Sequence, residues 1–213
     1  ARPSMGKSSF GATLAMNVSR SMPRRAVGFI SLEMDPVEIT GRLVEIESRL
    51  SMNQYDQFDE NDHRVLARAR TSVSRLPILI HNGRGMTISA CANKIRSWHA
   101  ENMMSCIIVD YIQKLKSDRD RDEEYQRISL ASGVLCDMAS EIGVPVIALA
   151  QLNRDAEGDR PMLKHLKGSG ALEQDAQVVL LLNPKGDDRV HRPIVDAEVI
   201  VEKRRGGSTG VAD

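Results

Sequence analysis

The sequence predicts an α/β fold in which a mainly parallel β-sheet is covered by helices on both faces. Short apolar runs of strand length alternate along the chain with segments that have helical periodicity. Several of these runs are apolar at every position, which is typical of strands that are buried on both faces of a parallel sheet. The 213 residues have the length of one such domain, and no internal repeat or domain boundary divides them.

Local signals place the helices and strands of the first half. Pro36 fits the first turn of a helix, and Thr87 is a suitable N-cap. The apolar run at residues 77–81 (PILIH) ends at Asn82-Gly83, which is a typical turn. We expect helices over residues 8–20, 35–50, 59–74 and 87–102, and strands over residues 26–32 and 77–81.

The second half continues the alternation. Residues 106–109 (CIIV) form a short apolar run that ends at Asp110, and residues 118–124 (DRDRDEE) are a charged loop without apolar residues. Polar loops are also expected at residues 155–161 and 185–192. We expect a helix over residues 125–141 and strands over residues 106–109, 144–149, 178–182 and 197–202.

The composition excludes some functions and leaves others open. The formal net charge is zero, so the whole chain gives no basic signal for nucleic acid, although local loops can still supply DNA contacts. Only 3% of residues are aromatic, which argues against a platform of stacked rings for single strands. The apolar runs are shorter than the roughly 20 residues of a membrane span, so we expect no membrane partner.

The cysteines and histidines are scattered along the chain. Cys91, Cys106 and Cys136 have apolar neighbours and no C-x-x-C spacing, which favours reduced core thiols in a cytoplasmic protein. The five histidines lack the spacing of metal ligands as well.

The chain opens on ARPSMGKS, which matches the phosphate-binding pattern G-x-x-x-x-G-K-[ST] except for Ala1 at its first position. Gly6 lets backbone N–H groups approach phosphate, Lys7 supplies a charge to the β- and γ-phosphates, and Ser8 offers a hydroxyl to Mg²⁺. The alternative is a chance Gly-Lys-Ser before a surface helix. The residues expected to bind ATP are Arg2, Ser4, Met5, Gly6, Lys7, Ser8 and Ser9.

A phosphate loop normally follows a buried strand. Because this loop stands at residue 1, we expect the chain to be a fragment of a longer protein, without the first strand of the sheet.

Three polar residues follow predicted strands, where ligands bind in open parallel sheets. Asp110 ends an apolar strand as a Walker B carboxylate does, and its alternative is a turn cap. Glu33, in SLEM, could orient the water that attacks the γ-phosphate, or it could be a charge at a helix N-terminus. Gln151, in AQLNR, could bind the γ-phosphate, or it could be a loop amide that bonds to backbone.

Together these segments resemble the C-terminal ATPase domain of the DnaB-type replicative helicases. The matching segments, in chain order, are ARPSMGKS, FISLEM, IIVDYIQ, ALAQLNR, GSGALEQDA and EKRRGG. The resemblance extends over nearly all of the chain and implies a RecA-like P-loop NTPase fold over residues 1–213. The resemblance also implies that the family's linker helix and N-terminal domain would lie outside the given residues.

The resemblance also implies roles for the matched positions. Glu33 would be the catalytic carboxylate, Asp110 the ligand of Mg²⁺ through water, and Gln151 the γ-phosphate sensor. Lys203 and Arg205 would reach the ATP that is bound by the neighbouring subunit and stabilise the charge that develops during transfer. Without the resemblance, the basic run 203–205 would be interpreted as a solvated turn.

The DNA-contacting loop of the family matches HLKGSG at residues 165–170, so Lys167, Gly168 and Gly170 are the expected DNA-binding residues. Gly168 stands where the family often has an acid. Residues 116–124 match a second channel loop, to which we assign no individual contacts.

The function implied by the resemblance is a homohexameric ring that moves 5′→3′ on single-stranded DNA and unwinds replication forks in a bacterial or phage-infected cell. Primase and a helicase loader would be its partners. The alternatives are a RecA/RadA-like recombination ATPase and a KaiC-like ATPase without a nucleic-acid role. A non-catalytic helicase-like partner is disfavoured, because Lys7, Glu33 and Asp110 are all present.

Overall fold

The computed structural model describes residues 6–119, 123–153, 160–166, 169–184 and 197–212. Its main sheet is parallel and has the strand order β2-β1-β3-β4. The inner strands β1 and β3 are buried at every residue, whereas the edge strands β2 and β4 are partly exposed. The strands are β1 Ala26–Ser31, β2 Ile78–Asn82, β3 Met104–Asp110 and β4 Val146–Leu149.

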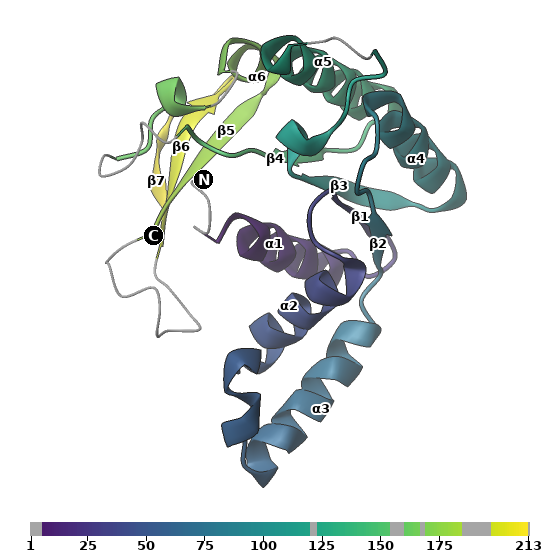
Figure 1. The fold of residues 1–213 in the computed structure, drawn as a ribbon, viewed down its shortest axis with the longest axis vertical. Helices are drawn as coiled ribbons and strands as arrows, with labels where there is room; N and C mark the ends of the chain where they lie inside the picture. The colour runs from purple at the N-terminus through teal and green to yellow at the C-terminus, as the bar shows by residue number, and fades with distance from the viewer. Residues whose placement is uncertain (1–5, 120–122, 154–159, 167–168, 185–196, 213) are drawn as a thin grey trace.

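Helices cover both faces of this sheet (Figure 1). Val27 and Phe29 of β1 pack on the face of α1 and α2, and Ile30 packs with α4 and α5 on the opposite face. The predicted two-sided burial of a parallel sheet is therefore confirmed. The helices are α1 Lys7–Ser21, α2 Pro36–Ser48, α3 Glu60–Ser74, α4 Ile88–Glu101, α5 Glu124–Ile142 and α6 Ser169–Asp175.

The α2–α3 pair extends away from the sheet as an arm, as Figure 1 shows. Leu43 of α2 and Leu66 of α3 belong to the apolar cluster that joins the two helices to α1. The N-cap of α2 is Asp35, which forms a capping box with Glu38, and Pro36 occupies the first turn as predicted. None of the helices in the described part of the chain has the length and apolar character of a membrane span.

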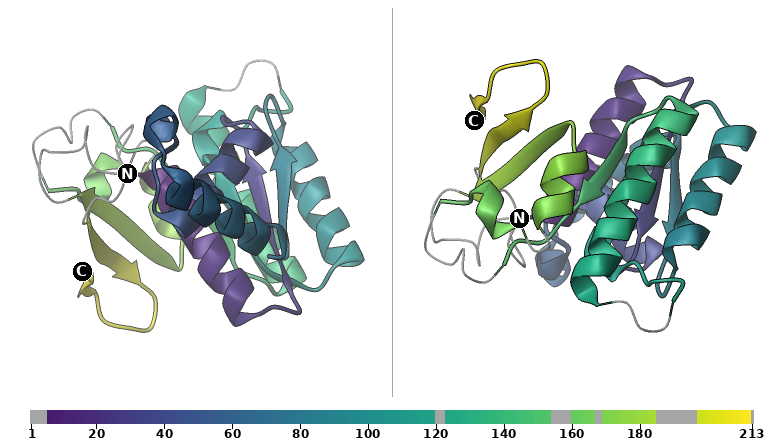
Figure 2. Two further views of the ribbon diagram at one scale, coloured as in Figure 1. Left: turned by 90° about the horizontal axis from the view of Figure 1, so that it is seen from below. Right: turned by 90° about the horizontal axis from the view of Figure 1, so that it is seen from above.

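The last three strands form a second, antiparallel sheet in the order β5-β6-β7 (Figure 2). These strands are β5 Val178–Pro184, β6 Ala197–Arg204 and β7 Gly210–Ala212. Leu181 and Ile200, which pair across β5 and β6, are buried together with Leu152 and Leu166 in a small separate core. Antiparallel pairing suits strands that follow each other closely in the chain, whereas parallel strands need a long crossover. The prediction of a mainly parallel sheet therefore holds for β1–β4.

Candidate active site at the carboxyl edge of the parallel sheet

Each strand of the parallel sheet leads to a polar residue at its carboxyl end. Asp110 is the last residue of β3, and Glu33, Arg84 and Gln151 each lie two residues beyond the ends of β1, β2 and β4, respectively. In open parallel sheets this edge is where ligands bind. Glu33, Asp110 and Gln151 are predicted from their places after strands, whereas Arg84 is not among the predicted residues.

The N-terminus of α1 opens onto the same edge. Gly6, its N-cap, has φ 75°, a left-handed conformation that glycine adopts without a steric cost. Among the residues that the structure describes, no side chain caps this end of α1, and its first turn contains no acidic residue. The first-turn N–H groups and the positive end of the helix dipole are therefore available to an anion.

Lys7, in the first turn of α1, is bound to the sheet edge through Asp110. Its Nζ lies 2.8 Å from Oδ1 of Asp110 and 3.7 Å from the centroid of the Tyr111 ring. The Lys7 side chain is 12% exposed and that of Asp110 is 3% exposed. Burial lowers the pKa of Lys7, while the negative charges of Asp110 and Glu33 oppose that shift. The Lys7 charge thus belongs to the same electrostatic site as both carboxylates.

This set of groups fits a magnesium–nucleotide complex. A triphosphate needs a cation and open N–H groups, which Lys7 and the start of α1 provide. Mg²⁺ prefers oxygen ligands, which the Asp110 carboxylate and the hydroxyl of Ser8, beside Lys7 in the first turn, can supply. Breaking a buried ion pair leaves an uncompensated charge, so Lys7 and Asp110 need new partners of opposite charge whenever they separate.

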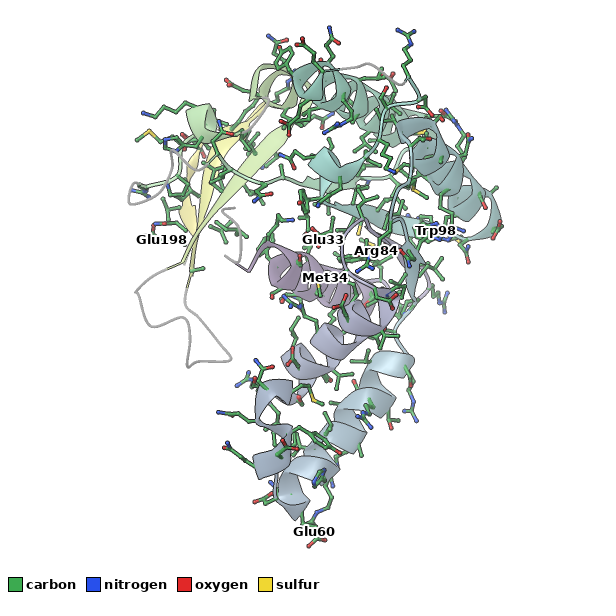
Figure 3. The ribbon with its side chains drawn as sticks, in the orientation of Figure 1. Glu33, Met34, Glu60, Arg84, Trp98 and Glu198 are labelled. Carbon is green, nitrogen blue, oxygen red and sulfur yellow. The ribbon has the colours of Figure 1, made fainter. Side chains whose placement is uncertain are left out.

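The turn that carries Glu33 is fixed by two neighbouring strands. Ser31 Oγ donates to the carbonyl of Met34 over 2.7 Å, and the guanidinium Nε of Arg84 donates to the carbonyl of Glu33 over 2.8 Å. Figure 3 shows Glu33 and Arg84 side by side at this edge. The Glu33 residue itself is exposed. A polar residue shortly after a strand was the signal that identified Glu33, and the same signal identifies Arg84.

Gly83 allows the β2 turn to approach β1 closely. Its N–H donates to the carbonyl of Ser31 over 2.8 Å. A Cβ at this position would lie 2.8 Å from Leu32 Cδ2 and 2.9 Å from Ile30 Cγ2, which is closer than such atoms can pack. Glycine at this position therefore brings Arg84 within reach of the Glu33 carbonyl.

Gln151 is held through its backbone by a second glutamine. The Nε2 of Gln113 donates to the Gln151 carbonyl over 3.1 Å, and the Gln151 N–H donates to Oε1 of Gln113 over 3.2 Å. Gln113 is 8% exposed and belongs to the segment IIVDYIQ, but it is not among the predicted site residues. Its pairing with Gln151 joins the ends of β3 and β4.

Lys203 and Arg205 contact the end of α6 rather than the Lys7 cluster. The Lys203 ammonium donates to the carbonyl of Glu173, and the Arg205 guanidinium donates to the carbonyl of Gln174. Cations are favoured at the negative end of a helix, and α6 ends within the segment GSGALEQDA. The two predicted trans-acting residues are thus close to each other and lie beside α6.

The remaining predicted site residues have separate positions. Ser9 Oγ accepts a hydrogen bond from Arg42 of α2 over 2.9 Å, so the Ser9 hydroxyl faces the arm. Gly170 is exposed in α6, where a Cβ would lie 3.4 Å from the hydroxyl of Tyr125. Five predicted residues lie outside the described part of the chain: Arg2, Ser4, Met5, Lys167 and Gly168.

The whole chain is similar to proteins of one known family. A family model described as the DnaB-like helicase C-terminal domain matches residues 1–213. The chain belongs to this family. The DnaB-like resemblance of the sequence motifs is therefore confirmed over the full length of the chain.

Curated relatives of this DnaB-like domain include two named replicative helicases. "Replicative DNA helicase DnaC" of Bacillus subtilis (strain 168) is 33% identical over 219 residues, covering 99% of this chain and 48% of the relative. "Replicative DNA helicase DnaB" of Leifsonia xyli subsp. xyli is 34% identical over 218 residues, covering 98% of this chain and 47% of the relative. The chain spans about half the length of the curated relatives it matches.

Solved structures show the same fold. One structure, described as an ATPase domain, has a TM-score of 0.86 at 32% identity and covers 99% of this chain and 77% of that chain. A second, described as a DnaB-like replicative helicase and its interactions with primase, has a TM-score of 0.86 at 32% identity, covering 99% and 54% of the two chains. The predicted RecA-like ATPase fold is confirmed.

Proposed function

We propose that this DnaB-like domain is the ATP-hydrolysing motor of a replicative DNA helicase. The observation that carries the proposal is the buried Lys7–Asp110 pair, which lies at the sheet edge where Glu33 and Gln151 also stand. An open helix N-terminus, a buried lysine and a strand-end carboxylate are the groups from which P-loop enzymes build a triphosphate site.

ATP and Mg²⁺ would be held by residues at the start of α1 and the end of β3. Gly6, Lys7 and Ser8 bind the phosphates, Arg2, Ser4 and Met5 complete the turn, and Ser9, whose hydroxyl faces Arg42, contributes its backbone N–H in the first turn of α1. Ser8 and Asp110 hold the metal site. When bound, Mg²⁺ neutralises charge on the β- and γ-phosphate oxygens. Lys7 then exchanges its carboxylate partner for a phosphate, so its buried charge stays compensated.

Residues at the carboxyl ends of β1 and β4, on either side of β3, would carry out hydrolysis. The Glu33 carboxylate, on a turn fixed by Arg84, orients the attacking water and accepts its proton. The Gln151 amide bonds to the γ-phosphate and changes partner when that phosphate leaves. Lys203 and Arg205 stabilise the transferring phosphoryl group that is bound by the next subunit. Such action across an interface requires an assembly of subunits, and we propose a homohexameric ring.

The ring would enclose single-stranded DNA and move along it 5′→3′. Lys167, Gly168 and Gly170 contact backbone phosphates in the channel, which makes movement independent of sequence and sensitive to salt. The curated relatives are replicative helicases of bacteria, and one structural neighbour interacts with primase. We therefore propose action in the cytoplasm of a bacterial or phage-infected cell, with primase and a helicase loader as partners.

Lys7→Ala tests the site most simply. We expect the wild-type chain to hydrolyse ATP faster with single-stranded DNA than without it, and Lys7→Ala to lose at least about a hundredfold in kcat/KM, because a desolvated phosphate contact is removed. ATP hydrolysis is measured alongside oligomer mass. Lys94→Ala, which removes a lysine of α4 beside Trp98, is the matched control. If Lys7→Ala hydrolysed ATP as fast as the wild type, Lys7 would not be part of a phosphate-binding site.

Two further measurements separate the rival functions. Unwinding of a forked duplex supports a helicase, whereas filament assembly without unwinding supports a RecA/RadA-like recombination ATPase. ATP hydrolysis that is indifferent to DNA, with no DNA binding at low salt, supports a KaiC-like ATPase.

A further inference from the structure

We propose that Gln113 and Arg127 are positioning residues that connect the sensor Gln151 to helix α5. Through them, the position of the α5 N-terminus sets the orientation of the sensor, so that DNA in the channel controls the rate of hydrolysis. This proposal rests on the proposed function and concerns how the same ATP site is regulated.

Gln113 fixes the Gln151 backbone at two points. Its side-chain amide donates to the Gln151 carbonyl over 3.1 Å and accepts from the Gln151 N–H over 3.2 Å. A primary amide offers both a donor and an acceptor, and this geometry uses both. Gln113 lies three residues after Asp110 and is 8% exposed, so a displacement of Gln113 moves the sensor relative to the metal-binding carboxylate.

Arg127 connects Gln113 to α5. Its Nη2 donates to the backbone carbonyl of Gln113 over 3.3 Å. The Nε of the same guanidinium is buried and has no hydrogen-bond partner within the described part of the chain. A buried unpaired donor raises the free energy of an arrangement. The position of Arg127 is therefore easier to change than one with every donor satisfied.

The N-terminus of α5 adjoins described residues of both predicted channel segments, Glu124 in one and Gly170 in the other. The helix begins at Glu124, directly after the charged residues 118–123, which belong to one of these segments. Tyr125, in its first turn, has its hydroxyl beside Gly170 of the other segment, at 3.4 Å from the position of a Cβ. DNA that displaces Glu124 or Gly170 therefore moves the first turn of α5, and Arg127 lies in that turn.

Two short links then complete the connection. Arg127 to Gln113 and Gln113 to Gln151 are consecutive hydrogen-bonded contacts between α5, the end of β3 and the end of β4. A contiguous network of this kind can carry coupling, and a double-mutant cycle measures whether it does.

The test compares ATP hydrolysis by the full chain with and without a single-stranded oligonucleotide. We expect Gln113→Leu to lower the DNA-stimulated kcat by roughly tenfold or more with KM for ATP within about twofold, because the sensor is misplaced while the phosphate turn is intact. We expect Arg127→Ala to lose at least about fivefold of the DNA stimulation while the DNA-free kcat stays within about twofold.

A conservative variant and a double variant test the connection between Arg127 and Gln113 more specifically. Arg127→Lys should restore most of the stimulation, because an ammonium can donate to the Gln113 carbonyl. The double variant Gln113→Leu/Arg127→Ala should be no slower than Gln113→Leu alone, since both changes interrupt one connection. Arg96→Ala is the matched control, because this arginine of α4 pairs with Glu141 of α5 away from the site.

Failure of the inference is distinguishable from failure of the proposed function. A wild-type chain that does not hydrolyse ATP overturns both. A DNA-stimulated wild type whose Arg127→Ala and Gln113→Leu variants match Arg96→Ala overturns the inference alone, as does equal loss by Arg127→Ala with and without DNA. If Gln113→Leu melts at a lower temperature, Gln113→Glu replaces it, because it keeps the acceptor and the size but not the donor.

Discussion

Lys7 and Asp110 are two buried charges that satisfy each other across 2.8 Å. Burial lowers the lysine pKa, and its negatively charged neighbours act in the opposite direction. In this arrangement Lys7 is already in contact with the carboxylate that we assign to the metal. When a nucleotide binds, Lys7 and Asp110 therefore exchange each other for new charged partners, and neither of these two charges has to be buried anew.

The buried thiols give a pH dependence of stability. Burial raises the pKa of Cys91 to about 12 and that of Cys106 to about 11, from 9.0. Because the unfolded thiols ionise first, their stabilising contribution is complete below pH 9.0 and is lost as the pH rises through the folded values. We expect the free energy of unfolding in urea to change differently between about pH 8 and pH 10.5 in the wild type and in Cys91→Ala/Cys106→Ala, since only the wild type has these two buried thiols to titrate. An identical pH profile in both would contradict this assignment.

Elements with strong local signals could be predicted from the sequence. The apolar runs of β1 and β3 correspond to strands that are buried at every residue, and Thr87 caps α4 by accepting from the Ala90 N–H. Polar residues after strands led to Glu33, Asp110 and Gln151 because parallel strands bring their carboxyl ends to one edge. In such cases the local pattern and the tertiary arrangement agree.

Elements that depend on distant contacts could not be predicted in this way. The short helix α6 and the strand β7 have only seven and three residues, too few for a periodic pattern. The separate antiparallel sheet depends on which strands pair, which composition does not reveal. The Gln113–Gln151 pair joins residues 38 positions apart, and a glutamine in a single 3-10 turn carries no signal of such a contact.

At the scale of the whole molecule, the site that we propose is distributed between two regions of the chain. Lys7, Glu33, Asp110 and Gln151 lie at the carboxyl edge of the parallel sheet, whereas Lys203 in β6 and Arg205 directly after it contact the end of α6. Figures 1 and 2 show the two sheets as separate parts of the fold. A site divided in this way suits assembly into a ring, in which the second region of one copy completes the first region of the next.

Mixing experiments test this trans arrangement. Titration of wild type with Arg205→Ala should lower ATPase turnover more than in proportion to the variant added, because each variant subunit also withholds its cation from a wild-type neighbour. The adjacent exposed Arg204 provides the matched variant Arg204→Ala, which should show only proportional effects. Activity of Arg205→Ala mixtures that is simply additive would argue against action across subunits.

The most direct test of the central claim is a crystal structure with Mg²⁺ and a non-hydrolysable ATP analogue. We predict the triphosphate against Gly6, Lys7 and Ser8, with the Lys7 ammonium on phosphate oxygens and the Asp110 carboxylate directed to the metal. An analogue bound elsewhere, or a soaked crystal in which Lys7 remains paired with Asp110 and the turn holds no phosphate, would contradict the account.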